Sequence, residues 1–149
     1  VGRILDWYKK AENKTSYPIE QDPGVLSVKK IYTYYKQNNI QTQVMGASFR
    51  STAQVLALAG CDLLTISPAL LDELSQQQDT VLQQLSLEQA LAEEKIVLDT
   101  LNEEKFKLAL ENDLMAIQLL QSGIDGFIKA REQLAQVLRE SFAIASIHA

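Results

Sequence analysis

Two short apolar segments, each followed by a helical segment, constrain the fold of this chain more than any other feature of its sequence. Residues 42–49 and 61–67 have the composition of buried strands, and a helix is expected over residues 52–59, closed by Gly60. Pro68 then opens another helix. Apolar strands that alternate with helices are typical of a parallel sheet covered on both faces. Because two strands cannot complete such a sheet, we expect its other strands upstream of the first residue.

The composition excludes several classes of protein. Of the 149 residues, 46% are hydrophobic and 22% are charged, which is ordinary for a globular domain. No run approaches the roughly 20 consecutive apolar residues of a membrane helix, and the first residues lack the pattern of a signal peptide. The net charge of −5 argues mildly against nucleic acid as a partner, because phosphate neutralisation needs clustered Lys and Arg. We therefore expect a soluble, cytoplasmic protein that binds neither membranes nor nucleic acids.

Cysteine and histidine are too scarce for several common sites. Cys61 is the only cysteine and His148 the only histidine, so neither an intrachain disulfide nor a Cys/His zinc cage can form. Cys61 directly precedes an apolar segment, which favours a buried, inert thiol over a nucleophile. His148 stands next to the last residue and is a poor partner for a serine hydrolase triad. The acidic residues show no ligand-loop spacing, and no metal site is expected.

Start and stop signals place helices on either side of the apolar segments. A short amphipathic helix is expected at residues 3–10. Asp22 can cap a second helix with Pro23 at its first position, and this helix lasts to about Gln37.

Beyond Gln76 the pattern is helical, with breaks that are hard to place. Ser86, Asn102 and Asp113 can each cap a helix, and the last of these helices is long, with apolar residues recurring at threes and fours. This part of the chain has no glycine-rich phosphate loop and no internal repeat. We expect it to be structural.

The candidate binding site lies where the first apolar segment meets the helix after it. Ser48 supplies a hydroxyl and Arg50 a guanidinium that can fork onto phosphate oxygens, while Ser51 or Thr52 can cap a helix whose start is electropositive. In parallel sheets this end of the strands carries the functional groups. Arg3 could join Arg50 on one ligand if the residues before it end another strand. The pattern predicts a site for the phosphate of a small molecule.

Several segments agree in order and spacing with one known family. They are Gly2-Arg-Ile-Leu-Asp-Trp-Tyr-Lys9, Asp22-Pro-Gly-Val25, Met45-Gly-Ala-Ser-Phe-Arg50, and Leu58-Ala-Gly-Cys-Asp62 with the following Leu64-Thr-Ile-Ser-Pro-Ala-Leu-Leu71. Together they resemble the C-terminal part of a class I transaldolase, over residues 1 to about 74. The resemblance is specific because unrelated-looking segments agree at once, whereas Ser-Phe-Arg alone would mean little.

The resemblance implies an α/β fold, namely the C-terminal portion of a (β/α)8 TIM barrel with about two strands, followed by closing helices. Residues 1–75 would hold the last strand–helix units of the barrel, and residues 76–149 would form a C-terminal helical segment packing on it. A homodimer of the full-length enzyme is possible in this family.

The resemblance also implies a chemistry. The family moves a dihydroxyacetone unit from sedoheptulose 7-phosphate or fructose 6-phosphate to an aldose phosphate in the pentose phosphate pathway. A lysine on an earlier strand forms a Schiff base with the ketose phosphate, and no cofactor takes part. The residues that hold the substrate phosphate match Arg3, Ser48 and Arg50. Because the lysine and the acidic proton-transfer residues belong to the first five strands, we expect no catalytic residue here and no activity from this chain alone.

The residues by themselves leave a second interpretation open. The chain could be a non-catalytic module, in which a half-barrel with a helical tail pairs with another chain. Arg3, Ser48 and Arg50 would then bind phosphate or merely form salt bridges. An upstream coding region that continues in frame with more strand–helix units and a strand lysine would favour the enzyme.

Overall fold

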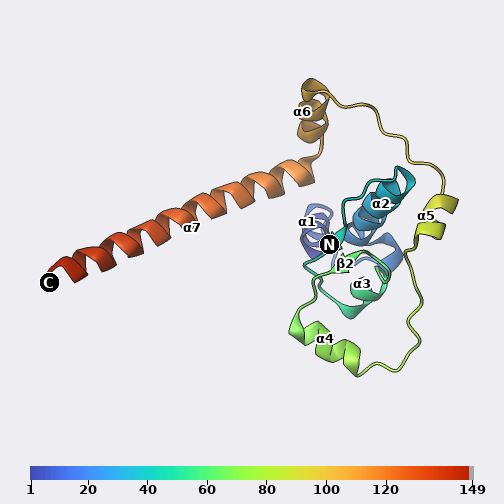
Figure 1. Cartoon of the computed structure of the whole chain (residues 1–149), viewed down its shortest axis with the longest axis horizontal. Helices are drawn as coiled ribbons and strands as arrows, with labels where there is room; N and C mark the ends of the chain where they lie inside the picture. The colour runs from blue at the N-terminus through green and yellow to red at the C-terminus, as the bar shows by residue number, and fades with distance from the viewer. Residues whose placement is uncertain (148–149) are drawn as a thin grey trace. The chain divides into compact units, whose positions relative to one another are not determined.

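A computed structural model of the chain describes residues 1–147, and its elements divide after Asp99 into two units (Figure 1). His148 lies outside the described residues. The elements of the first unit are α1 (Gly2–Ala11), the 3-10 turn η1 (Ile19–Gln21), α2 (Pro23–Gln37), β1 (Met45–Gly46), α3 (Thr52–Leu56), β2 (Leu63–Leu64), α4 (Pro68–Ser75) and α5 (Leu87–Ala92). The second unit holds α6 (Glu103–Asn112) and α7 (Leu114–Ile147).

The two strands pair in parallel, as their alternation with helices predicts. Met45 lies opposite Leu63 and Gly46 opposite Leu64. The ladder continues at both ends, because the Leu63 N–H donates to the Val44 carbonyl at 3.1 Å and the Thr65 N–H to the Gly46 carbonyl at 2.8 Å. The chain is therefore an α/β protein, mostly helical, with a two-stranded parallel sheet.

Both strands are much shorter than the segments 42–49 and 61–67 expected from the sequence. Two local features shorten β1. The Val44 N–H donates to the Asp62 carboxylate at 2.9 Å and not to a neighbouring strand. On the other side, Ser48 has a φ of 61°, a left-handed conformation that ends an extended segment.

The helix expected over residues 52–59 is also shorter, because α3 ends at Leu56. Residues 57–60 instead form a tight turn in which the Leu58 N–H donates to the Val55 carbonyl at 3.1 Å. Gly60 has a φ of 99°, and a Cβ at this position would collide with the Leu85 carbonyl oxygen. A glycine is therefore required at the turn. The expectation that Gly60 closes the helix is wrong, because the C-cap of α3 is Ala57.

The helix starts proposed from the sequence are confirmed. Asp22 accepts from the Gly24 and Val25 N–H groups at 2.8 and 3.1 Å. Three further side chains each accept a hydrogen bond from the backbone N–H three residues further on: Ser86, Asn102 and Asp113. The helical pattern beyond residue 76 is nevertheless interrupted, since residues 77–86 and 93–102 lie outside any helix.

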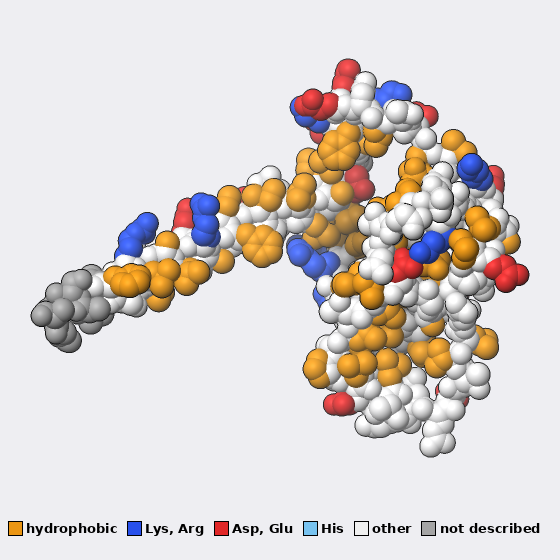
Figure 2. Space-filling model, viewed as in Figure 1, with side chains coloured by type: hydrophobic (Ala, Val, Ile, Leu, Met, Phe, Trp, Pro, Cys, Tyr) orange, Lys and Arg blue, Asp and Glu red, His pale blue; other side chains and the backbone are white. Residues whose placement is uncertain are grey.

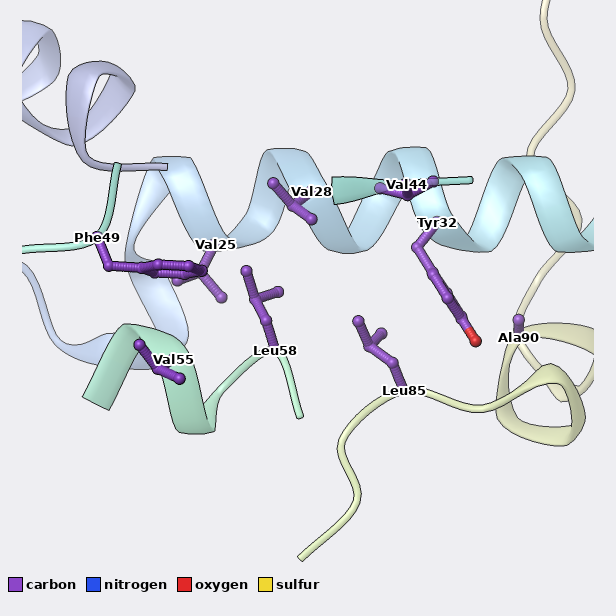
Figure 3. Close-up of a cluster of buried hydrophobic side chains, with 9 residues drawn as sticks. All are labelled: Val25, Val28, Tyr32, Val44, Phe49, Val55, Leu58, Leu85 and Ala90. Carbon is purple, nitrogen blue, oxygen red and sulfur yellow. The ribbon is translucent and has the colours of Figure 1, made fainter. Parts of the chain in front are cut away.

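The core of the first unit forms under one face of α2. Figure 3 shows Val25, Val28 and Tyr32 on this face, with their side chains directed toward Leu58 and Leu85. Leu58 is fully buried. The remaining members of the cluster come from the residue before β1, the turn after β1, α3 and α5, in that order: Val44, Phe49, Val55 and Ala90. The turn that carries the candidate site is thus anchored, through Phe49, in the same core as α2.

Side-chain hydrogen bonds hold the segment after α5 against the end of α2, one of them from Thr33 Oγ1 to Glu93 Oε2 at 3.2 Å. Gln37 donates from Nε2 to the Ala90 carbonyl at 2.9 Å, and its Oε1 accepts from the Ile96 N–H at 2.8 Å. Because both the nitrogen and the oxygen of the Gln37 amide are bonded, the segment after α5 is held next to α2 although it is not helical.

The second unit consists of two helices in contact with each other. Figure 2 shows hydrophobic side chains along α7, and the exposed ones include Leu120, Ile124, Phe127, Ile128, Leu134 and Leu138. No helix among the described residues combines the length and the apolar character needed to cross a membrane. That this helical segment packs on the strand–helix units stays a prediction.

Candidate functional site

Ser48 lies in the turn that leaves the C-terminal end of β1. Its side chain is exposed, and its φ of 61° is uncommon for a residue other than glycine. The Ser48 carbonyl oxygen accepts two hydrogen bonds, from the Gly2 N–H at 3.0 Å and from Arg50 Nη1 at 2.8 Å. The left-handed residue therefore joins β1, the start of α1 and the Arg50 side chain.

The start of α1 lies directly against this turn. The Val1 nitrogen donates to the Ala47 carbonyl at 2.9 Å, one residue before the Gly2 contact. Gly2 is buried, and a Cβ on it would collide with the Ser48 carbonyl oxygen and lie 2.8 Å from the Arg50 Cγ. Only glycine permits this close approach.

Arg3 follows Gly2 on α1, and its side chain is exposed. Among the described residues, no hydrogen bond or ion pair to its guanidinium is found. Gly2, the residue before Arg3, contacts the turn that holds Ser48 and Arg50. That Arg3 shares one ligand site with these two residues stays a prediction.

The Arg50 guanidinium is fixed by a residue that the sequence did not indicate. Arg50 Nε and Nη2 both donate to Oδ2 of Asp6, at 3.1 and 2.8 Å. Asp6 and Arg50 are 44 residues apart in the chain, which is why no local pattern reveals the pair. The available signal is the spacing on α1, since Asp6 follows Arg3 by three residues and lies on the same helical face.

The backbone of Arg50 is held from the interior of the protein. Its N–H donates to Gln54 Oε1 at 2.7 Å, and Gln54 Nε2 donates to Asp22 Oδ2 at 2.7 Å. Gln54 and Asp22 are only 1% and 3% exposed. Sequence reasoning found Asp22 as a helix cap and missed Gln54, whose only signal is that it lies one turn before the buried Leu58.

Of the two residues expected to cap α3, Ser51 does so. Its hydroxyl accepts from the Gln54 N–H at 3.4 Å, whereas the buried Thr52 hydroxyl donates to Glu73 on α4 at 3.1 Å. Because α3 has only five residues, its dipole adds little to the site.

The arrangement offers hydrogen-bond donors and positive charge to an anion. Arg50 and its partner Asp6 together carry no net charge, and Arg3, on the same helix as Asp6, brings the sum of the three side chains to about +1. Cys61 is half-buried, and its Sγ lies 3.3 Å from the Val44 carbonyl. No lysine of the described residues stands on β1, on β2 or in the turn after β1. Within the same part of the chain, no three His, Cys, Asp or Glu side chains gather into a group that could hold a metal.

Comparison with known proteins adds independent information. Residues 1–138 match the family model described as Transaldolase/Fructose-6-phosphate aldolase. The transaldolase of Prochlorococcus marinus (strain NATL1A) is 49% identical over 141 residues, which are 94% of this chain and 42% of that protein. The transaldolase of Hamiltonella defensa is 51% identical over 143 residues, or 96% of this chain and 44% of that protein. The transaldolase of Rhizobium rhizogenes is 49% identical over 146 residues, or 98% of this chain and 44% of that protein.

This chain therefore spans less than half the length of the curated relatives that it matches. The matched region includes Arg3, Asp6, Ser48 and Arg50.

Proposed function

Because this chain belongs to the transaldolase and fructose-6-phosphate aldolase family, we propose that it forms the phosphate-binding end of a sugar-phosphate site. In this proposal residues 1–75 are the last strand–helix units of a (β/α)8 barrel, and residues 76–149 form a helical segment that packs on them. The parallel pairing of β1 with β2 supports the assignment, since barrel strands are all parallel.

The proposed reaction is that of a transaldolase. A dihydroxyacetone unit passes from sedoheptulose 7-phosphate or fructose 6-phosphate to an aldose phosphate, as a step of the pentose phosphate pathway. A lysine on an earlier barrel strand forms the Schiff base that carries this unit. We further propose that the enzyme is cytoplasmic and that its full-length form is a homodimer.

In this scheme the chain binds and orients the substrate. The Arg50 guanidinium forks onto phosphate oxygens, Arg3 adds a second positive charge, and the Ser48 hydroxyl donates a hydrogen bond. Binding the phosphate holds the carbonyl carbon of the ketose at a fixed distance from the lysine that attacks it. The attack then starts from an oriented complex and not from a random collision. The observation that carries the proposal is the turn itself, where the start of α1 contacts Ser48 and Arg50 is held in place.

Calorimetric titration of the chain tests this proposal. We expect fructose 6-phosphate to bind and fructose to bind at least tenfold more weakly, because charge-assisted contacts to the phosphate are worth about 1.5–3 kcal/mol each. Arg50→Ala should abolish the preference for the phosphorylated sugar. Lys30→Ala is the matched control, since it removes one exposed positive charge from α2. Equal affinity for the two sugars, or an Arg50→Ala variant that binds like the wild type, would overturn the proposal.

Schiff-base trapping separates the binding role from catalysis. With fructose 6-phosphate and borohydride, we expect no covalent adduct on any lysine of this chain. An adduct on one of its own lysines, accompanied by turnover with erythrose 4-phosphate, would show that the chain is catalytic by itself.

A further inference from the structure

We propose that Asp6 is a positioning residue that holds the Arg50 guanidinium in the orientation needed for phosphate. This inference rests on the proposed function, because it assigns a further residue to the same site. Asp6 itself does not contact the phosphate; it acts through Arg50.

The geometry of the pair determines which donors remain available. A guanidinium carries five N–H donors, and three of them are used, two by Asp6 Oδ2 and one by the Ser48 carbonyl. Because the group is planar, the bonds from Nε and Nη2 to Asp6 occupy one of its edges. The two unused donors belong to Nη1 and Nη2. Asp6 therefore leaves Arg50 two donors on adjacent nitrogens, which suits the bidentate recognition of a phosphate.

The position of Asp6 on α1 gives the pair a rigid base. Asp6 lies one helical turn after Gly2, and the Gly2 N–H is bonded to Ser48. Arg3 lies on the same helical face, three residues before Asp6. One short helix thus carries a proposed phosphate ligand and the residue that orients the other one.

The exposure of the pair argues against a mainly structural role. The Arg50 and Asp6 side chains are 42% and 51% exposed. Exposed ion pairs of this kind contribute little to the stability of a fold. An exposed arginine with free rotamers loses conformational freedom when it binds a ligand, and a partner that already holds it removes part of that cost.

An opposite effect is also possible for a carboxylate at this place. The negative charge of Asp6 repels a phosphate, so a purely electrostatic role would make Asp6→Asn bind fructose 6-phosphate more tightly. If Asp6 instead orients Arg50, Asp6→Asn should bind fructose 6-phosphate more weakly. The sign of the change in affinity therefore distinguishes the two roles.

The test compares Asp6→Asn with the wild-type chain by calorimetric titration with fructose 6-phosphate. We expect the dissociation constant to rise about twofold to tenfold, the range for one side chain that must be ordered on binding. Asp6→Glu, which keeps the carboxylate, should restore most of the affinity. Glu12→Gln is the matched control, because it removes one exposed negative charge from the end of the same helix, where Glu12 pairs with Lys14 and not with Arg50.

A spectroscopic measurement reports on the pair directly. The Arg50 Nε–H signal in a nitrogen–proton correlation spectrum, assigned by its loss in Arg50→Lys, should be protected from solvent exchange in the wild type. Asp6→Asn should shift this signal and remove the protection, and Glu12→Gln should leave it unchanged. If Asp6→Asn affected only the overall stability of the fold, it would not alter the Arg50 signal selectively.

The outcomes separate this proposal from the one on which it rests. If the wild type binds fructose 6-phosphate but Asp6→Asn binds it equally well or more tightly, or leaves the Arg50 signal unchanged, Asp6 is not a positioning residue. The phosphate site itself then stands. If the wild type does not distinguish fructose 6-phosphate from fructose, the proposed function fails and this role of Asp6 fails with it.

Discussion

At the scale of single residues, Ser48 shows how the proposed binding site conflicts with stability. A left-handed conformation costs an L-amino acid roughly 1–2 kcal/mol, whereas glycine adopts it without steric strain. The chain nevertheless has serine at this position, at a φ of 61°. The strain is consistent with a hydroxyl that is kept for a ligand, and the structure relies on this turn to direct the Ser48 carbonyl at both Gly2 and Arg50.

Replacing Ser48 by glycine should therefore change stability and binding in opposite directions. We expect Ser48→Gly to raise the free energy of unfolding by about 0.5–1 kcal/mol, after the added entropy of the unfolded glycine is subtracted. The same variant should bind fructose 6-phosphate about threefold to tenfold more weakly, because it lacks the hydroxyl. Urea denaturation and calorimetric titration measure the two effects.

Two further variants make this prediction specific. Ser48→Ala also loses the hydroxyl but keeps the Cβ, so it should weaken binding without raising stability. Asn39→Gly relieves a φ of 53° in the turn after α2, away from the site, and should leave binding unchanged. A Ser48→Gly variant that binds as tightly as the wild type would remove the hydroxyl from the list of phosphate contacts.

The same scale shows where sequence reasoning about the site stops. Ser48, Arg50 and Arg3 could be proposed because each stands in a recognisable local pattern or family motif. The roles of Asp6 and Gln54 could not be proposed, although Asp6 stands in a family motif, since these roles arise from contacts across 44 and 32 residues. In the sequence alone, a buried glutamine such as Gln54 cannot be told from a glutamine on the surface.

At the scale of elements, a charged pair joins α2 to the sheet. Asp62 Oδ1 accepts from Lys36 Nζ at 2.7 Å, while Oδ2 accepts from the Val44 N–H at 2.9 Å. Burial opposes the ionisation of Asp62, but the hydrogen bonds from Lys36 and Val44 outweigh it, so the pKa of Asp62 lies below its ordinary value. The hydrogen bond to Asp62 likewise raises the pKa of Lys36 against the effect of burial.

The pKa shifts define the pH range over which the pair stabilises the fold. A lowered carboxyl pKa contributes stability above the unfolded value of about 3.9, and this contribution is lost as the pH falls through the folded pKa. The raised pKa of Lys36 contributes stability below the unfolded value of about 10.4, and this contribution is lost as the pH rises through the folded pKa of Lys36. Between about pH 5 and pH 10, the contribution of the pair should be constant.

Asp62→Asn tests this range. At pH 7 we expect the variant to lose about 1–2 kcal/mol of unfolding free energy, because the amide replaces a charge-assisted bond to Lys36. The difference from the wild type should shrink at pH 3, because the carboxyl of the unfolded wild-type chain, with its ordinary pKa of about 3.9, takes up a proton there. Urea denaturation at pH 7, 5 and 3 gives the comparison, and Asp72→Asn on α4 is the control for a lost exposed charge. A difference that stays equal at all three pH values would contradict this account.

The elements also show what the sequence could specify and what it could not. Helix starts are local, and those at Asp22, Ser86, Asn102 and Asp113 follow from a side-chain oxygen placed before a helix. Strand lengths depend on neighbours, and apolar composition alone overestimated both strands. Val44 illustrates the reason, because its N–H is bonded to the Asp62 side chain, a contact that no composition rule describes.

At the scale of the whole molecule, the sheet leaves part of its apolar surface uncovered. Met45 and Leu63 lie opposite each other in the parallel ladder, so their side chains share one face of the sheet. They are 54% and 39% exposed, although such residues are usually buried in parallel sheets. Within the described residues, each strand has a single neighbour, so one edge of β1 and one edge of β2 are unpaired. A barrel of the proposed kind would pair both edges and fill this face with side chains.

An uncovered sheet of this kind should make the chain associate with itself. Unpaired edges and exposed apolar side chains favour intermolecular contact, so we expect the mass measured by light scattering after gel filtration to rise with concentration. Met45→Lys should reduce this rise, because a charge on the sheet face opposes its burial. Leu82→Lys is the matched control: Leu82 is 69% exposed but lies in the segment between α4 and α5 and not on the sheet. A chain that stays monomeric at every concentration and melts in one sharp transition would contradict this account. The two-stranded sheet would then be stable with its edges unpaired, and the need for further barrel strands would lose its physical basis.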